Sequence, residues 1–287
     1  MSGARQTVRM LVRAREDFQA MRKRMDNRIG RKADGTAQNI EEREFREDHA
    51  LMFSSIADAA RGQEKAIEKM LRTVLREFPV YTGFLSGVKG VGDIAAGWII
   101  GEYDIHKATN VSKLWQFTGL NPGMVPGKKR CAVAEYKPEK MGRVVSTFYD
   151  DKGKPEEYIY LSGQMVPGDR LIPGHVAPFN KRLRTAMVGV LADGFIKAQA
   201  TYALEYYYPY KARLEQEASE IEGVSKDAGK AWSDVSKGHR DRAAKRYMIK
   251  MFLKDLYVAW RTLEGLPVRR SYQEEYLGHE HGEDETE

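Results

Sequence analysis

The chain has 287 residues, of which 42% are apolar, enough to bury a hydrophobic core in one large domain or two small ones. No apolar run approaches the about 18 residues of a membrane span, and the amino terminus lacks the pattern of a secretory signal. We therefore expect a cytoplasmic protein with no membrane partner. The single cysteine, Cys131, excludes an internal disulfide.

The charge is more basic than its formal value of +6 indicates. Residues 273–287 contain seven acidic side chains and no lysine or arginine, so residues 1–272 carry 47 basic and 34 acidic side chains, a net charge of +13. Such an excess favours a polyanionic partner because each phosphate contact releases counterions. A basic protein with a solvated surface is the other interpretation. Residues 269–287 are predicted to form a disordered acidic tail.

Two helices are predicted in residues 1–80. Residues 5–32 carry ten basic side chains over a seven-residue apolar repeat that is typical of a coiled coil. The repeat consists of Leu11, Ala14, Phe18, Met21 and Met25. After a break at residues 32–35, a second helix should run from about Asn39 to Phe78. Its apolar stripe comprises Met52, Ile56, Ala60, Ile67, Met70, Leu71, Val74 and Phe78. The expected hairpin packs within its own domain or pairs two copies as a homodimer or higher oligomer.

Residues 84–122 have the pattern of a helix-hairpin-helix unit, which binds a nucleic-acid backbone. The hairpin is predicted at Gly90-Val91-Gly92, because glycine allows a tight turn and a close approach to a ligand. Exposed N–H groups of the next helix would face a phosphate. Asp93 is expected to cap that helix. The candidate contacts are Lys89, Gly90, Val91 and Gly92, and a plain tight turn is the alternative.

Proline and glycine become frequent after Pro122. The alternating runs 143–149 and 156–161 flank Asp150-Asp-Lys-Gly153, which predicts a β-hairpin. Helices should resume at Phe179. The chain is therefore predicted to be mainly α, with a second domain at residues 81–268 that an insertion at about residues 123–178 interrupts.

Two basic segments of the second domain are candidates for phosphate contact. One opens the helix after Phe179 and contains Lys181, Arg182 and Arg184. The other lies on the last strong helix, where Arg242, Arg246 and Lys250 recur every four residues opposite an apolar stripe. The stripe comprises Ile249, Phe252, Leu253, Leu256, Trp260 and Leu263. Guanidinium groups suit phosphates because their planar forks bond two oxygens at once, although charged rows are also typical of a solvated helix face.

Catalytic patterns are scarce. The sequence has no metal-binding carboxylate cluster, Walker-type loop or zinc-protease motif, so no metal site and no cofactor are predicted in this chain. Ser162, which precedes Gly163 in a loop rich in glycine and proline, is either a nucleophile or a turn residue.

The order of these segments resembles the carboxy-terminal part of the DEDD-type insertion-sequence transposases, the bridge-RNA-guided recombinases. Four stretches carry the likeness: residues 8–29, residues 87–122 with the closing Gly119-Leu-Asn-Pro122, residues 180–184 and residues 237–260. The resemblance covers nearly the whole chain. It implies binding to DNA, with or without a structured guide RNA, by a protein of a prokaryotic or phage mobile element.

The chain departs from that family in two places. Family members begin with a nuclease-like domain whose four acidic residues bind divalent metal, whereas here the predicted coiled coil begins almost at Met1. Mg²⁺ and its carboxylates are therefore expected from a nuclease-like partner protein. The family's nucleophilic serine follows the Gly-Leu-x-Pro segment, where this chain has Pro126. A realignment across the insertion moves that role to Ser162, which would then attack a DNA phosphodiester.

The resulting prediction is a reduced or split transposase that binds nucleic acid during DNA transposition or recombination. A catalytically inactive nucleic-acid-binding adaptor or assembly protein is the alternative. A structural protein that uses its coiled coil alone is a third interpretation, which requires no salt-sensitive binding of nucleic acid.

Overall fold

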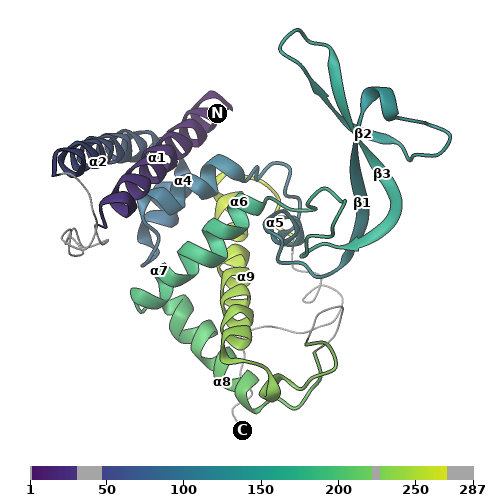
Figure 1. The fold of residues 1–287 in the computed structure, drawn as a ribbon. Helices are drawn as coiled ribbons and strands as arrows, with labels where there is room; N and C mark the ends of the chain where they lie inside the picture. Colours follow the sequence, from purple (N-terminus) through teal and green to yellow (C-terminus); the bar gives the residue numbers. More distant parts are fainter. Residues whose placement is uncertain (1, 31–46, 222–226, 270–287) are drawn as a thin grey trace. The chain divides into compact units, whose positions relative to one another are not determined.

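The computed structural model describes residues 2–30, 47–221 and 227–269. It is mainly α-helical with one three-stranded antiparallel sheet (Figure 1), which confirms the predicted fold class. The chain divides into two compact units, unit 1 at residues 1–104 and unit 2 at residues 105–287. The break predicted at residues 32–35 and the acidic tail beyond residue 269 lie outside the described residues.

Unit 1 begins with two paired helices, α1 (Ser2–Ile29) and α2 (Glu47–Leu75). They run antiparallel, because Arg15 of α1 contacts Glu68 whereas Arg28, near the end of α1, lies over the ring of Phe53. The described parts of these helices thus form the hairpin expected from the apolar repeat.

The buried line of α2 differs from the predicted stripe. Met52, Ile56 and Met70 were expected in the core, but Met52 is 51% exposed and Met70 is 50% exposed. The buried line consists of Ala57, Ala60, Glu64, Ile67, Leu71 and Leu75. The predicted residues Ala60, Ile67 and Leu71 do lie on this line. Glu64 occupies its middle because two arginines of α1 neutralise its charge.

A short helix, α3 (Pro79–Gly83), and a 3₁₀ turn (Leu85–Gly87) lead into α4 (Asp93–Glu102). Close packing of α4 on α1 and α2 depends on Gly97. A Cβ atom at this position would lie 2.7 Å from Cγ2 of Val12 and 3.1 Å from Cδ2 of Leu71. Because α4 packs on both long helices, the first compact unit ends after Asp104 and not after residue 80.

The arginines of α1 are neutralised within unit 1. Arg22 donates to Glu64 at 2.6 Å, and Arg15 donates to Glu68 at 3.0 Å. Arg5 forms an ion pair with Asp104 and donates to the carbonyls of residues 100 and 102 at the end of α4, and Arg9 donates to the carbonyl of Gly101. Arg5, Arg9, Arg15 and Arg22 therefore fasten α1 to its neighbours.

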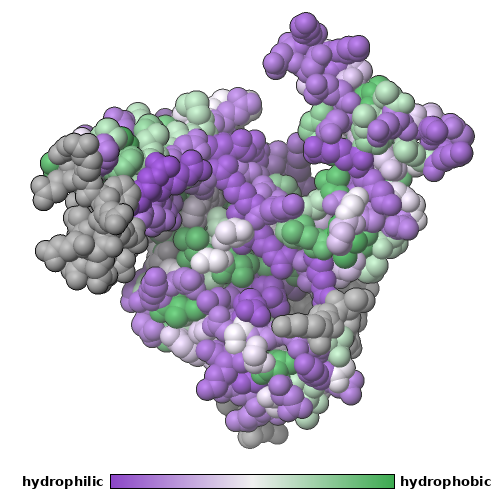
Figure 2. Space-filling model, in the orientation of Figure 1, coloured by the Kyte–Doolittle hydropathy of each residue, from purple (hydrophilic) through white to green (hydrophobic). Residues whose placement is uncertain are grey.

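The sheet of unit 2 comprises β1 (Met124–Ala132), β2 (Val144–Tyr149) and β3 (Pro155–Pro167) in the order β1-β3-β2. The predicted hairpin is the pair β2 and β3. Its turn is held by Oδ1 of Asp150, which accepts from the backbone N–H groups of Lys152 and Lys154. Hydrophilic residues cover this end of the sheet (Figure 2).

Strand β1 was not predicted from the sequence. It contains Pro126 and Gly127, two residues that disfavour a regular strand. The structure accommodates them in a bulge, where the register with β3 shifts between Pro126 and Lys128. Pairing with β3 therefore overrides the local preference of this segment.

The helical part of unit 2 surrounds α9 (Figure 1). Its elements are α5 (Val111–Thr118), α6 (Lys181–Arg184), a π-helical segment (Thr185–Leu191), α7 (Ala192–Lys197), a second π-helical segment (Ala203–Tyr207), α8 (Tyr208–Gln216), a 3₁₀ turn (Trp232–Asp234) and α9 (Lys237–Leu263). The predicted stripe of α9 is buried except for Leu263, which is 42% exposed because it is the last residue of the helix. None of the helices in the described ranges is long and apolar enough to cross a membrane.

Candidate nucleic-acid interface

Four cationic side chains gather where α6 lies near α9. Arg184 is the last residue of α6, and Arg242, Arg246 and Lys250 recur every four residues, which places them on one side of α9. Arg184 and Arg242 both repel the positive charge of Arg246, and Arg246 repels that of Lys250. We call these four residues the cationic cluster. The structure thus brings the two predicted basic segments together.

Burial and neighbouring cations disfavour the charged forms of Arg246 and Lys250. Burial lowers the pKa of Arg246, and Arg184 and Arg242 lower it further. Burial likewise lowers the pKa of Lys250, with a second contribution from Arg246. The pKa of Arg184 is lowered by burial. An anion that reaches the site stabilises the charged forms and offsets this cost.

Asp169 is the acidic residue that faces the cluster. Its carboxylate raises the pKa values of Arg184, Arg246 and Lys250, opposing the effect of burial. Its backbone oxygen also accepts a hydrogen bond from Nη1 of Arg184. In the part of the chain that the structure describes, neither Arg242 nor Arg246 has a hydrogen-bond or ion-pair partner. One carboxylate therefore leaves the site with excess positive charge.

Aromatic rings support two of the cations. Nζ of Lys250 lies 5.3 Å from the ring centre of Trp115, whose indole N–H donates to the backbone oxygen of Lys250. Cζ of Arg184 lies 4.8 Å from the ring centre of Phe179. That ring packs on Gly119, where a Cβ atom would lie 2.6 Å from Cγ of Phe179. Aromatic support orients the cations without neutralising them.

Lys181 and Arg182 extend the basic surface along the first turn of α6, where both side chains are exposed. The turn is fixed by Asn180, whose side-chain oxygen accepts from the backbone N–H of Leu183. All six basic residues predicted in unit 2 therefore lie on α6 or on α9, the two helices that carry the cluster.

The predicted hairpin lies in unit 1, between α3 and α4. Gly90 has a φ of +94°, which favours glycine, and Lys89 is exposed beside it. Gly92 precedes the first residue of α4 and leaves open space where a Cβ atom would stand. The local geometry is that of a tight turn before a helix, and phosphate binding by Lys89, Gly90, Val91 and Gly92 stays a prediction.

The expected cap of α4 is wrong. Gly92, not Asp93, occupies the capping position, and Asp93 is already the first helical residue. Its carboxylate accepts from Nε of Arg72 at 2.6 Å and from the hydroxyl of Tyr81 at 2.7 Å. These long-range partners hold the carboxylate at the helix start, where it provides the negative charge that a phosphate would otherwise supply.

Ser162 lies in β3, and the chain on both sides of it is strand. Its Oγ accepts from the backbone N–H of Gln164 at 3.3 Å. A Cβ atom on Gly127 would lie 2.7 Å from this Oγ and 3.0 Å from Cδ2 of His175, so the glycine of β1 makes room for both side chains. Within the described residues, no hydrogen bond joins Ser162 to the cationic cluster.

Two residues of the site were missed in the sequence, Asp169 and Trp115. Asp169 follows β3 in an irregular segment, and Trp115 is 135 residues from the lysine that it supports. Neither has a local sequence signal, because each joins the site through tertiary packing.

Comparison with family models, with curated proteins and with solved structures finds no match to this chain. In the described ranges, no group of three or more His, Cys, Asp or Glu side chains is arranged to hold a metal ion. The candidate site therefore rests on its own geometry and charge.

Proposed function

We propose that this chain binds nucleic acid through the cationic cluster. The observation that carries the proposal is the state of Arg246 and Lys250, which are half-buried, repelled by neighbouring cations and, among the residues that the structure describes, faced by the carboxylate of Asp169. A phosphodiester supplies the missing negative charge. An arginine can also bond two phosphate oxygens at once through its planar guanidinium group. A charge that only keeps a surface hydrated needs no such geometry.

The extent of the cluster favours a polymer with repeated phosphates. Arg242 and Lys250 are separated by roughly 12 Å along α9, and Arg184 adds a contact from α6. Lys181 and Arg182 continue the basic surface beyond it. One small anion cannot reach all of these groups, whereas a DNA or RNA strand presents a charge at every nucleotide.

Arg246→Gln tests the binding site, with Arg61→Gln as the matched control. Both changes remove one positive charge, but Arg61 is paired with Asp58 at 2.5 Å and with Asp26 at 3.7 Å in unit 1. We expect Arg246→Gln to weaken binding of DNA or RNA on the order of tenfold, and Arg61→Gln to leave it nearly unchanged. Fluorescence anisotropy measures both affinities. Equally weakened binding in the two variants contradicts a specific role for the cluster.

The resemblance to insertion-sequence transposases supports a role for this binding in DNA transposition or recombination. In that setting the chain is a reduced or split transposase, and a nuclease-like partner supplies the carboxylates and Mg²⁺. Ser162 is the proposed nucleophile: its Oγ bonds to a phosphorus atom and loses its proton, the bond from that phosphorus to a deoxyribose oxygen breaks, and the leaving oxygen takes up a proton to become a free hydroxyl.

Suicide DNA substrates test this step, because they trap the serine-linked strand. The recombinase proposal predicts an adduct that Ser162→Ala abolishes when Mg²⁺ and the partner are present. Salt-sensitive binding without an adduct favours the catalytically inactive adaptor instead. Binding and cutting are thus separable in one set of experiments.

The outward face of α2 supports pairing of two copies through the helical hairpin. Met52, Ile56, Ala59, Ala66 and Met70 are exposed on a line of α2 outside its buried line, with the polar Gln63 between Ala59 and Ala66. This second line lies beside the buried line that packs on α1. A homodimer or higher oligomer formed in this way buries apolar side chains that the single chain leaves in water.

A further inference from the structure

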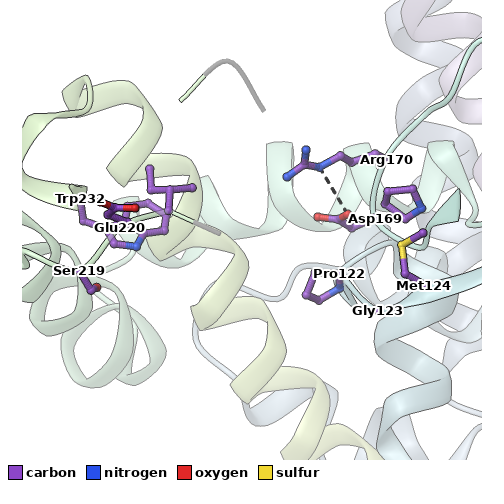
Figure 3. Close-up of a pocket in the computed structure, with 10 residues that line it drawn as sticks. Pro122, Gly123, Met124, Asp169, Arg170, Ser219, Glu220 and Trp232 are labelled. Atoms are coloured by element: carbon purple, nitrogen blue, oxygen red, sulfur yellow. Dashed lines mark ion pairs between the residues drawn. The ribbon is translucent and has the colours of Figure 1, made fainter. Parts of the chain in front are cut away.

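Beside the cationic cluster, unit 2 contains a pocket of about 680 Å³. One wall comes from the start of β1 and the chain after β3, and includes Pro122, Met124, Asp169 and Arg170. The opposite wall precedes α9 and includes Ser219, Glu220, Ile221 and Trp232. Figure 3 shows the two walls facing one another across the open space. The volume is ample for a single aromatic group together with its attached sugar.

The pocket has flat apolar surfaces and polar edges. Trp232, Pro122 and the exposed thioether of Met124 provide the apolar surface. Asp169 and Glu220 add two carboxylates, against the single guanidinium of Arg170. Both carboxylates are hydrogen-bond acceptors at the edges of the pocket. A neutral aromatic group that carries N–H donors fits it, because carboxylates accept such hydrogen bonds.

Asp169 connects the pocket to the cluster. It lines the pocket, its backbone oxygen accepts from Arg184, and its carboxylate attracts Arg246 and Lys250. Arg170 forms an ion pair with the same carboxylate at 3.7 Å (Figure 3). The cationic cluster and the pocket therefore adjoin at Asp169.

We propose that this pocket receives one unstacked nucleobase of a strand whose phosphates lie on the cationic cluster. The inference rests on the proposed function and narrows it to single-stranded or locally opened nucleic acid. The base stacks on Trp232, and its amino group donates to Asp169 or Glu220. Stacking on an aromatic side chain accepts any base, so the pocket adds affinity for an unpaired strand without requiring a fixed sequence.

The test compares variants of the protein on two strands, one with bases and one without. The full chain, Trp232→Ala and Arg246→Gln are titrated with short oligo(dC) and with an abasic strand of equal length, which keeps the phosphates and lacks the bases. For the unaltered chain, removal of the bases should weaken binding on the order of tenfold. For Trp232→Ala the two strands should bind almost equally, whereas Arg246→Gln should weaken binding of both.

Trp232→Phe preserves a stacking surface and should retain the preference for oligo(dC), which separates loss of stacking from loss of folding. Equal binding of the two strands by the unaltered chain overturns the base pocket and leaves phosphate binding intact. An undiminished preference in a folded Trp232→Ala variant also overturns it. Absence of salt-sensitive binding to either strand contradicts the proposed function itself, so the two failures are distinguishable.

Discussion

The arginines of α1 and those of the cationic cluster have opposite environments. In unit 1, Arg15 and Arg22 are paired with Glu64 and Glu68. In unit 2, Arg246 has like charges as its neighbours and Asp169 as the facing acid. Both regions are rich in arginine, but carboxylates neutralise Arg15 and Arg22, whereas neighbouring cations repel Arg246. The difference shows that a basic run in a sequence indicates a binding surface only if carboxylates elsewhere in the fold do not neutralise it.

The largest expected effect on the free energy of unfolding comes from removing the charge of Glu64, which pairs with two arginines of α1. Glu64 is 5% exposed and contacts Arg22 at 2.6 Å and Arg15 at 3.4 Å. Glu64→Gln leaves two arginines partly buried without that charge, which should lower the free energy of unfolding by about 3 kcal/mol. Urea denaturation measures the decrease. A change near zero shows that the pairing in unit 1 is not structural.

Removing a cation from the cationic cluster should stabilise unit 2. Arg246→Met retains an unbranched stem for packing and removes a cation that Arg184 and Arg242 repel. Without a ligand, the free energy of unfolding should rise by about 1 kcal/mol, as is common when a binding site that costs stability is removed. Urea denaturation without nucleic acid checks this. Destabilisation by a similar amount means that Arg246 is held by the fold as firmly as the arginines of α1.

The lowered pKa of Lys250 predicts a pH dependence. The unfolded chain has an ordinary lysine pKa of about 10.4, above that of the folded protein, so the unfolded state binds the proton more tightly. Relative to Lys250→Met, stability should therefore rise as the pH increases through the folded pKa toward the unfolded value. Denaturation curves of both proteins across this range measure the difference, and parallel curves exclude the effect. Saturating nucleic acid should reduce it by stabilising the charged form.

The smallest expected effect on folding comes from the outward face of α2. Ile56→Glu with Met70→Glu changes two exposed side chains and should alter stability by no more than about 0.5 kcal/mol. If copies pair through this face, light scattering should show a fall in mass from an oligomer to a single chain. Retention of the oligomer by the double variant places the contact elsewhere.

Local patterns predicted much of this fold and part of the site. The apolar stripe of α9, the turn at Asp150 and the four-residue spacing of Arg242, Arg246 and Lys250 all follow from periodicity or turn chemistry, which neighbouring residues decide. The inward face of α2 was predicted only in part: Ile67 and Leu71 are buried as expected, but the place of Glu64 among them depends on distant arginines. Asp169 was missed because only tertiary packing brings it to α9.

The boundary between the two units also depends on tertiary packing, which local sequence patterns do not reveal. A stop signal at Pro79 predicts the end of α2, but Gly97 packs against Val12 and thereby includes α4 in unit 1. The hairpin at Gly90 is consequently part of the unit whose arginines are paired. The cationic cluster lies in unit 2 and includes Arg246, which neighbouring cations repel, so it is the stronger candidate for nucleic-acid contact.

The salt dependence of binding decides whether the cationic cluster neutralises phosphates. The logarithm of the association constant for single-stranded DNA is measured against the logarithm of the salt concentration for the unaltered chain, Arg246→Gln and Arg61→Gln. We predict a steep negative slope for the unaltered chain and for Arg61→Gln. In Arg246→Gln the slope should become shallower by roughly 0.7 for each phosphate that the variant no longer neutralises. A slope near zero for the unaltered chain, or the same slope for all three proteins, contradicts phosphate binding by the cluster.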